Sequence, residues 1–125
     1  MKYETLIMEF VKSFPELKER SDSEFERWQG DEPPVHVFFG YVLNPFLLEQ
    51  LTALDNPKLL HRIFEFLELM AESNDENVRD VLIATVLERL GDDKKILESA
   101  KIFMKSKTRE MSDKVEKFWE PQKHT

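Results

Sequence analysis

Two of the three histidines stand beside residues with which they could do chemistry. His36 enters an aromatic segment directly after a proline pair, and with Tyr41 it could face a small catalytic or ligand-binding pocket. A histidine that is hydrogen-bonded to a backbone carbonyl at a helix start is the more ordinary interpretation. His61 and Glu65 lie four residues apart and could supply two metal ligands, but exposed pairs at this spacing are common and weak. We therefore predict no metal site.

The catalytic motifs that can be read from spacing alone are absent from the sequence. There is no serine nucleophile elbow, phosphate-binding loop or dinucleotide glycine fingerprint, and only 3 glycines are available to build one. The lack of cysteine excludes thiolate chemistry and a disulfide framework. We therefore expect no catalytic residues and no cofactor.

A tryptophan beside a proline-rich loop is the best candidate for a binding residue. Trp28 stands among charged residues at the edge of this loop (residues 29–34), a setting typical of an interface anchor. Partial burial of Trp28 against its own domain is at least as good an interpretation. The predicted partner-binding residues cluster on and before the loop: Glu24, Glu26, Trp28, Asp31 and Glu32.

The formal charge of −7 is unevenly distributed along the chain. Residues 94–125 carry 9 Lys/Arg and 5 Asp/Glu, whereas residues 1–93 carry 9 and 20. An acidic body repels phosphate backbones, which disfavours nucleic-acid binding, and it attracts a basic protein. A solvated acidic face with no partner is the ordinary alternative, because charged surfaces are the norm.

The chain shows no sign of a membrane segment or a secretory leader. A glutamate interrupts the short apolar run near the N-terminus, and no small-residue cleavage site follows. No apolar stretch approaches the roughly 20 residues that a membrane helix needs. Together with the lack of cysteine, this favours a cytoplasmic protein without membrane contact; the oligomeric state is not predicted.

The clearest elements are two consecutive helices between residues 56 and 91. Asn56 and Pro57 are typical of an N-cap and first helical residue, and apolar residues follow at helical spacing. Residues 73–76 offer several cap oxygens for the second helix, among them Ser73 with Glu76 at the spacing of a capping box, and Gly91 is expected to end the helix in a left-handed conformation.

The N-terminal part predicts further short helices. One covers residues 3–13, Ser13 and Glu16 suggest a capping box for the next, and we expect a break near residues 21–23. Residues 29–34 form a loop. Residues 35–43 are apolar enough for a buried strand or a buried helix, and we favour a helix because no second strand could pair with it.

Helices are expected to continue to the C-terminus. A second Asn-Pro pair, Asn44 and Pro45, predicts a new helix start, and Asp92 with Asp93 opens another helix. A break within residues 105–108 precedes the last helix, which Pro121 is expected to end. We predict one helical domain over residues 1–120 and a frayed tail over residues 121–125.

One stretch resembles a known helical repeat. Residues 75–82, Asp-Glu-Asn-Val-Arg-Asp-Val-Leu, and the exit Glu-Arg-Leu-Gly-Asp at 88–92 are similar to the second helix of a HEAT-type repeat. The resemblance covers about one repeat, residues 57–91. It implies antiparallel helical pairs, with Arg79 bracing a carboxylate or carbonyl at the end of the preceding helix.

A second resemblance is to small all-helical bacterial proteins, among them immunity-type proteins. It rests on size, acidity and the stretch from Phe38 to Pro45. The sequence thus predicts an all-α, single-domain chain built as a short, right-handed stack of antiparallel helical pairs. We expect a non-enzymatic protein-binding module, for example an immunity protein or inhibitor directed at a basic partner. The alternative is a small helical enzyme or ligand-binding domain with its pocket near His36 and Tyr41.

Overall fold

The chain folds entirely into helices and loops over its described part. The computed structural model describes the backbone of residues 1–123 and the side chains of residues 1–118. The predicted all-α class is confirmed. The helices, in order, are η1 (Tyr3–Thr5), α1 (Leu6–Ser13), η2 (Pro15–Leu17), α2 (Lys18–Arg27), α3 (Val35–Phe38), η3 (Phe39–Leu43), α4 (Asn44–Ala53), α5 (Pro57–Ala71), α6 (Glu76–Asp80), η4 (Val81–Leu87), α7 (Glu88–Gly91), α8 (Lys94–Phe103) and α9 (Ser106–Lys123).

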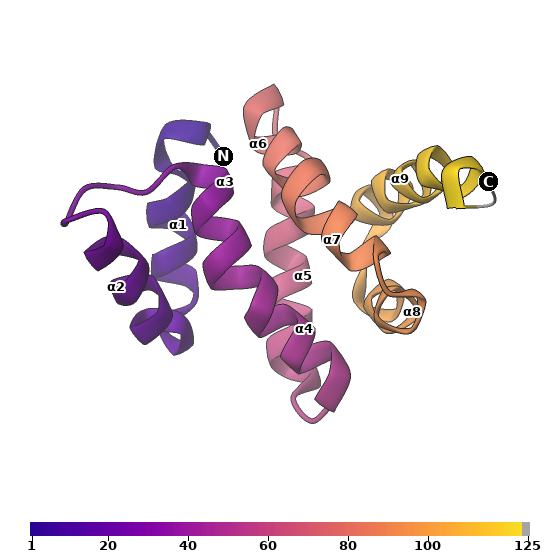
Figure 1. Cartoon of the computed structure of the whole chain (residues 1–125), viewed down its shortest axis with the longest axis horizontal. Coiled ribbons are helices and arrows are strands. Elements are labelled where there is room, and N and C mark those ends of the chain that lie inside the picture. Colours follow the sequence, from indigo (N-terminus) through magenta and orange to yellow (C-terminus); the bar gives the residue numbers. More distant parts are fainter. Residues whose placement is uncertain (124–125) are drawn as a thin grey trace.

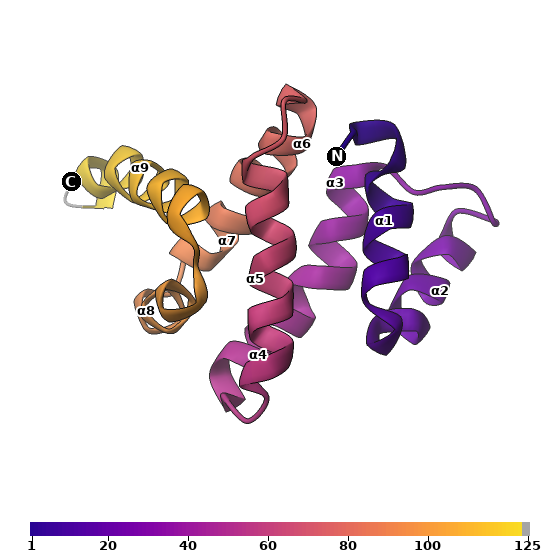
Figure 2. The same cartoon turned by 180° about the vertical axis from the view of Figure 1, so that it is seen from behind.

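Successive helices reverse direction across the molecule. In Figure 1, α1 descends, α2 rises, the α3–η3–α4 unit descends, α5 rises, and the α6–η4–α7 unit descends again. The last two helices, α8 and α9, lie beyond α7 at the end opposite to α2 (Figure 2). The alternation agrees with antiparallel pairing, while the right-handed, HEAT-type stack stays a prediction.

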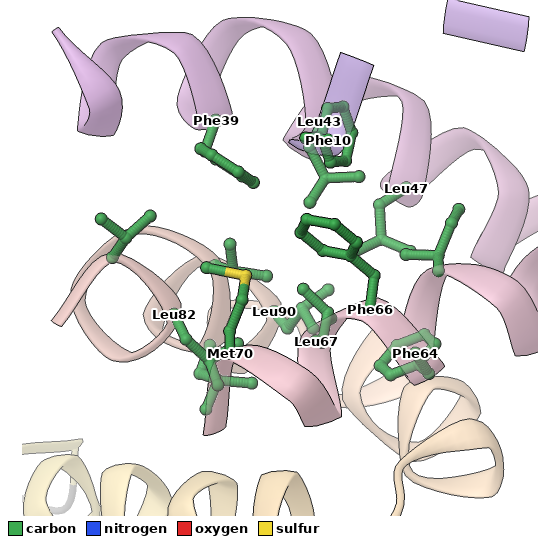
Figure 3. Close-up of a cluster of buried hydrophobic side chains, with 14 of the residues drawn as sticks. Phe10, Phe39, Leu43, Leu47, Phe64, Phe66, Leu67, Met70, Leu82 and Leu90 are labelled. Carbon is green, nitrogen blue, oxygen red and sulfur yellow. The ribbon is translucent and has the colours of Figure 1, made fainter. Parts of the chain in front are cut away.

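The core is built around phenylalanines from α1, from the continuous α3–η3 segment and from α5. The ring of Phe10 lies 5.1–5.8 Å from the rings of Phe38, Phe39 and Phe66. These edge-on arrangements stabilise aromatic pairs beyond their burial alone. Figure 3 shows the side chains of the long α3–α4 unit facing those of α5 across this core. The segment over residues 35–43 is therefore a buried helix, as favoured, and not a strand.

The expectation that Asn44 and Pro45 start a new helix is wrong. The chain runs without interruption from Val35 to Ala53, and the Asn44 N–H donates to the Phe39 carbonyl, a π-helical bond to the fifth residue back. Pro45 has no N–H, and its ring would clash with a regular preceding turn; a locally widened helix relieves this conflict. The Asn44 side chain instead donates to the Thr85 carbonyl at 3.0 Å.

The helix that begins after residue 75 uses one of the predicted cap residues, but not the capping box of Ser73, and its end differs from the prediction. Asp75, not Ser73, is its N-cap and accepts from the Asn77 N–H at 3.0 Å. The Ser73 hydroxyl donates to the Met1 carbonyl at 2.7 Å, so it ties down the N-terminus. Gly91 is the last residue of α7 and its backbone is not left-handed, and Asp92 after it also lies in the right-handed helical region.

The predicted break near residues 21–23 is also absent. Helix α2 runs from Lys18 to Arg27, and Ser21 is buried within it. The capping box of Ser13 and Glu16 does not form, because the Glu16 carboxylate binds Arg62 of α5. A contact with a helix 46 residues away has replaced the local one.

Two helix starts near the C-terminus have different origins. Asp93 caps α8 through its own carboxylate, as predicted. Helix α9 begins at Ser106, and its N–H groups at Lys107 and Thr108 donate to Glu68 of α5 at 3.1 and 2.9 Å. Its backbone continues to Lys123, beyond Pro121, which therefore does not end it. Of the predicted tail, residues 124–125 lie outside the described residues.

The bracing role predicted for Arg79 is confirmed. Its Nη1 donates to the Ser73 carbonyl at 2.7 Å, just beyond the C-terminal end of α5. The guanidinium thus satisfies a carbonyl that has left the helical ladder and fixes the turn between α5 and α6.

Candidate functional site

A buried glutamate organises the end of α2. Only 4% of the Glu24 surface is exposed, yet the side chain is ionisable and must be paired. Its two carboxylate oxygens accept from Arg27 Nη1 at 3.0 Å and from the Trp28 indole Nε1 at 2.9 Å. Because these residues are three and four positions further along the helix, they return to the same face. The buried Glu24 carboxylate therefore fixes the side chains of Arg27 and Trp28 from the protein interior.

Arg27 connects this group to a second aromatic ring. Its guanidinium carbon lies 4.7 Å from the ring centroid of Tyr41, which belongs to η3. Trp28 is 38% exposed and Tyr41 is 60% exposed. We call Arg27, Trp28 and Tyr41 the aromatic surface; Glu24 is its buried support.

The loop after α2 places carboxylates beside the aromatic surface. Gln29 and Gly30 both adopt positive φ, at 56° and 86°, which ends the helix and turns the chain away. The Gly30 N–H donates to the Phe25 carbonyl at 3.0 Å, as in a helix C-cap. The predicted loop is confirmed. Its end carries Asp31 and Glu32, which are exposed.

The structure distributes the five predicted partner-binding residues between a surface and its support. Trp28 lies on the surface, and Glu26, Asp31 and Glu32 are exposed, with no ion-pair partner among the side chains that the structure describes. Glu24 is buried and positions Trp28 instead of facing solvent. Sequence reasoning missed Arg27 and the link to Tyr41, and no local pattern connects residues 14 positions apart.

The two residues named for the alternative pocket, His36 and Tyr41, have different partners. His36 Nδ1 lies 2.7 Å from the Thr85 hydroxyl oxygen, so its partner is a side chain and not a backbone carbonyl. Tyr41 lies beneath Arg27. Phe38 and Phe39 belong to the core.

The residues considered for a metal site have ordinary contacts. The His61 ring packs edge-on against Phe103, with 4.9 Å between ring centroids. Glu65 lies 4.0 Å from the Lys105 ammonium. Among the side chains that the structure describes, no three His, Cys, Asp or Glu residues are grouped so as to hold a metal ion. None of the described helices combines the length and the apolar character required to cross a membrane.

Comparison with known proteins identifies a family but no function. The family model described as "Domain of unknown function (DUF7674)" matches residues 7–120. Neither the curated proteins nor the solved structures contain a match to the chain. The resemblances to HEAT-type repeats and to immunity-type proteins are not tested by these comparisons and stay predictions. Because the match covers nearly the whole fold, from α1 to α9, the chain belongs to the DUF7674 family.

Proposed function

We propose that this protein is a non-enzymatic protein-binding module whose aromatic surface, with the carboxylates beside it, engages a basic partner. One observation carries the proposal: a buried glutamate holds Trp28 and Arg27, and Arg27 covers Tyr41. Burying a charged group costs free energy unless the group is paired. A carboxylate that is buried in order to hold Trp28 and Arg27 therefore suggests that the position of these side chains matters.

The residue types of this surface support a role in binding. Tryptophan, tyrosine and arginine are the residues that most often dominate the binding energy of protein interfaces. Here Trp28 and Arg27 are held by hydrogen bonds before any partner arrives. Less side-chain entropy is then lost on association, which increases the affinity that a given contact area provides.

The surrounding charge supports a basic partner. Glu26, Asp31 and Glu32 are exposed, and no cation of the described chain neutralises them. Carboxylates at the rim of an interface accelerate encounter with a cationic protein and suppress acidic competitors. A concrete form of this function is an immunity protein or inhibitor that blocks a cationic toxin such as a nuclease, its carboxylates occupying the place of phosphates.

Affinity capture from a lysate of the native host tests the proposal. The wild-type chain is compared with the double variant Trp28→Ala, Tyr41→Ala and with the triple variant Glu26→Gln, Asp31→Asn, Glu32→Gln. A matched control, Glu72→Gln, Glu76→Gln, Asp80→Asn, removes the same charge from exposed positions outside this surface. We expect a basic protein to be captured by the wild type and the control, weakly by the charge variant and not by the aromatic variant.

The capture experiment, with one further variant, distinguishes the binding module from an enzyme. Capture that is equal for all four proteins, or the absence of any basic protein, would contradict the proposal. His36→Ala should leave capture unchanged, since His36 contacts Thr85 away from Trp28. Under the alternative of a small enzyme or ligand-binding domain, the same substitution should abolish turnover or ligand binding.

A further inference from the structure

A second site lies at the other end of the molecule, among η4, α7 and α9. A pocket of about 470 Å³ opens there, within the range of small-molecule sites. Figure 1 shows α7, α8 and α9 grouped around this region, far from α2. The lining residues that matter to its chemistry are Asn44, Glu88, Arg89, Ser112 and Val115.

Two buried polar side chains of this pocket have unused hydrogen-bonding groups. Asn44 is 8% exposed, and its amide nitrogen donates to the Thr85 carbonyl, but its amide oxygen has no donor in the described part of the chain. Ser112 is 3% exposed, and its hydroxyl makes no hydrogen bond there either. Neither atom is among the fully buried unpaired side-chain atoms of the described chain, so both are open to the pocket and can hydrogen-bond to a molecule bound there.

The charges of the pocket leave one carboxylate available. Arg89 and Asp92 form an ion pair at 3.7 Å, and Glu116 pairs with Lys101 at 2.6 Å. Glu88 has no ion-pair partner among the described side chains and lines the same pocket. The available groups are then a carboxylate, an amide oxygen and a hydroxyl, which together favour a ligand that donates hydrogen bonds and carries positive charge.

The pocket continues into an apolar neighbour. A second pocket of about 360 Å³ shares Glu88 and Val115 with the first. Its other walls are the apolar residues Ile83, Met111 and Phe118 and the side chain of Lys114, whose ammonium group pairs with Glu110 at 3.5 Å. The free carboxylate therefore stands at the junction between a polar and an apolar compartment.

We propose that this pair of pockets binds a small organic cation, in which an ammonium or guanidinium group is joined to an aliphatic chain. Its N–H groups donate to Glu88, to the amide oxygen of Asn44 and to the hydroxyl of Ser112. Its aliphatic chain lies against Val115, toward Phe118. This site does not share residues with the aromatic surface, so the proposal stands independently of the proposed function.

Titration of the ¹⁵N-labelled full chain with agmatine and with hexylamine tests the inference, and hexanoate serves as a probe of the opposite charge. We expect saturable shifts of amide signals from η4, α7 and α9 with the two cations and none with hexanoate. Glu88→Gln should weaken cation binding by about tenfold or more, since a charge-assisted bond is lost. Ser112→Ala should weaken it several-fold.

Glu98→Gln is the matched control, because Glu98 is exposed, without an ion-pair partner among the described side chains, and outside both pockets. It should bind the cations as the wild type does. Three results would overturn the proposal: shifts that do not saturate, equal binding of hexanoate, or unchanged affinity in both Glu88→Gln and Ser112→Ala. Retained chemical shifts elsewhere show that each variant is folded.

Discussion

The end of α2 and the pocket beside α9 use buried polar groups in opposite ways. At the end of α2, the carboxylate of Glu24 is satisfied by Arg27 and Trp28, and the product is a fixed, outward-facing set of side chains. In the pocket, the residues Asn44 and Ser112 are also buried, but each keeps one unpaired polar atom that is open to the pocket. A buried group that is paired within the chain fixes its neighbours, whereas a polar atom that is open to a pocket is available to a ligand. The two regions should therefore respond differently to substitution.

Loss of Glu24 should have the largest effect on stability. Glu24→Ala removes two charge-assisted hydrogen bonds and a buried side chain, and we expect the free energy of unfolding to fall by about 2–3 kcal/mol. Urea denaturation followed by circular dichroism measures this change. A loss below about 0.5 kcal/mol, the size of an ordinary surface substitution, would show that Glu24 does not support the aromatic surface.

Arg79 should stabilise the fold without supporting either the aromatic surface or the pocket. It braces the turn between α5 and α6, so Arg79→Ala should lower stability by about 1–3 kcal/mol through loss of its bond to the Ser73 carbonyl. Arg79→Lys should recover only part, because the planar fork is lost. If Arg79→Ala keeps full stability yet loses capture of the partner, Arg79 belongs to the functional surface and its structural assignment is wrong.

Glu68 stabilises the helix that forms one wall of the pocket, and its contribution should depend on pH. Burial alone would raise the pKa of Glu68. This effect is outweighed by hydrogen bonds from the Thr108 N–H and hydroxyl and from the Lys107 N–H, so the pKa of Glu68 lies below its ordinary value. A lowered folded-state pKa contributes stability above the unfolded pKa, near 4.5. That contribution is lost as the pH falls through the folded pKa.

Glu68→Gln should therefore cost about 1–2 kcal/mol at pH 7, where three charge-assisted bonds are weakened. The difference from the wild type should shrink below about pH 4. Urea denaturation of both proteins between pH 7 and pH 3 tests this. A difference that is constant over that range would exclude the carboxylate charge as the cause.

Ser112→Ala should have the smallest effect. The hydroxyl makes no hydrogen bond in the described part of the chain, so the substitution removes none, and alanine is the better helix former by about 0.5 kcal/mol. We expect stability to stay within about 0.5 kcal/mol of the wild type. A loss above 1 kcal/mol would mean that Ser112 is paired within the protein, and the contrast with Glu24 would disappear.

The two Asn-Pro pairs show how far the sequence predicts this fold. Asn56 accepts from the Leu59 N–H at 3.2 Å and begins α5, as its pattern indicates. Asn44 and Pro45 have the same local signal but lie inside a longer helix. Asn44 is buried against η4, and its side chain donates to the Thr85 carbonyl. Burial of the neighbouring apolar face, and not the local capping signal, therefore keeps Asn44 and Pro45 inside the longer helix. Helical class, the α8 cap and the role of Arg79 were accessible because each depends on nearby residues.

Several of the missed features depend on distant contacts. Glu68 and the start of α9 are about 40 residues apart, and Arg27 meets Tyr41 across the loop after α2. A candidate surface could be predicted from Trp28 and its acidic neighbours. The supporting role of Glu24 and the place of Tyr41 on the surface could not be predicted, because both depend on how α2 packs against η3.

The most direct test of the proposed binding surface follows the Trp28 indole during complex formation. The ¹⁵N-labelled chain is titrated with the basic protein captured by the wild type, and the indole N–H signal, assigned with Trp28→Phe, is read together with the backbone amides. The account predicts that this signal and the amides of residues 26–32 and of η3 shift on binding, while those of α7 and α9 do not. An unchanged Trp28 indole signal, with shifts confined to the pocket helices, would contradict it.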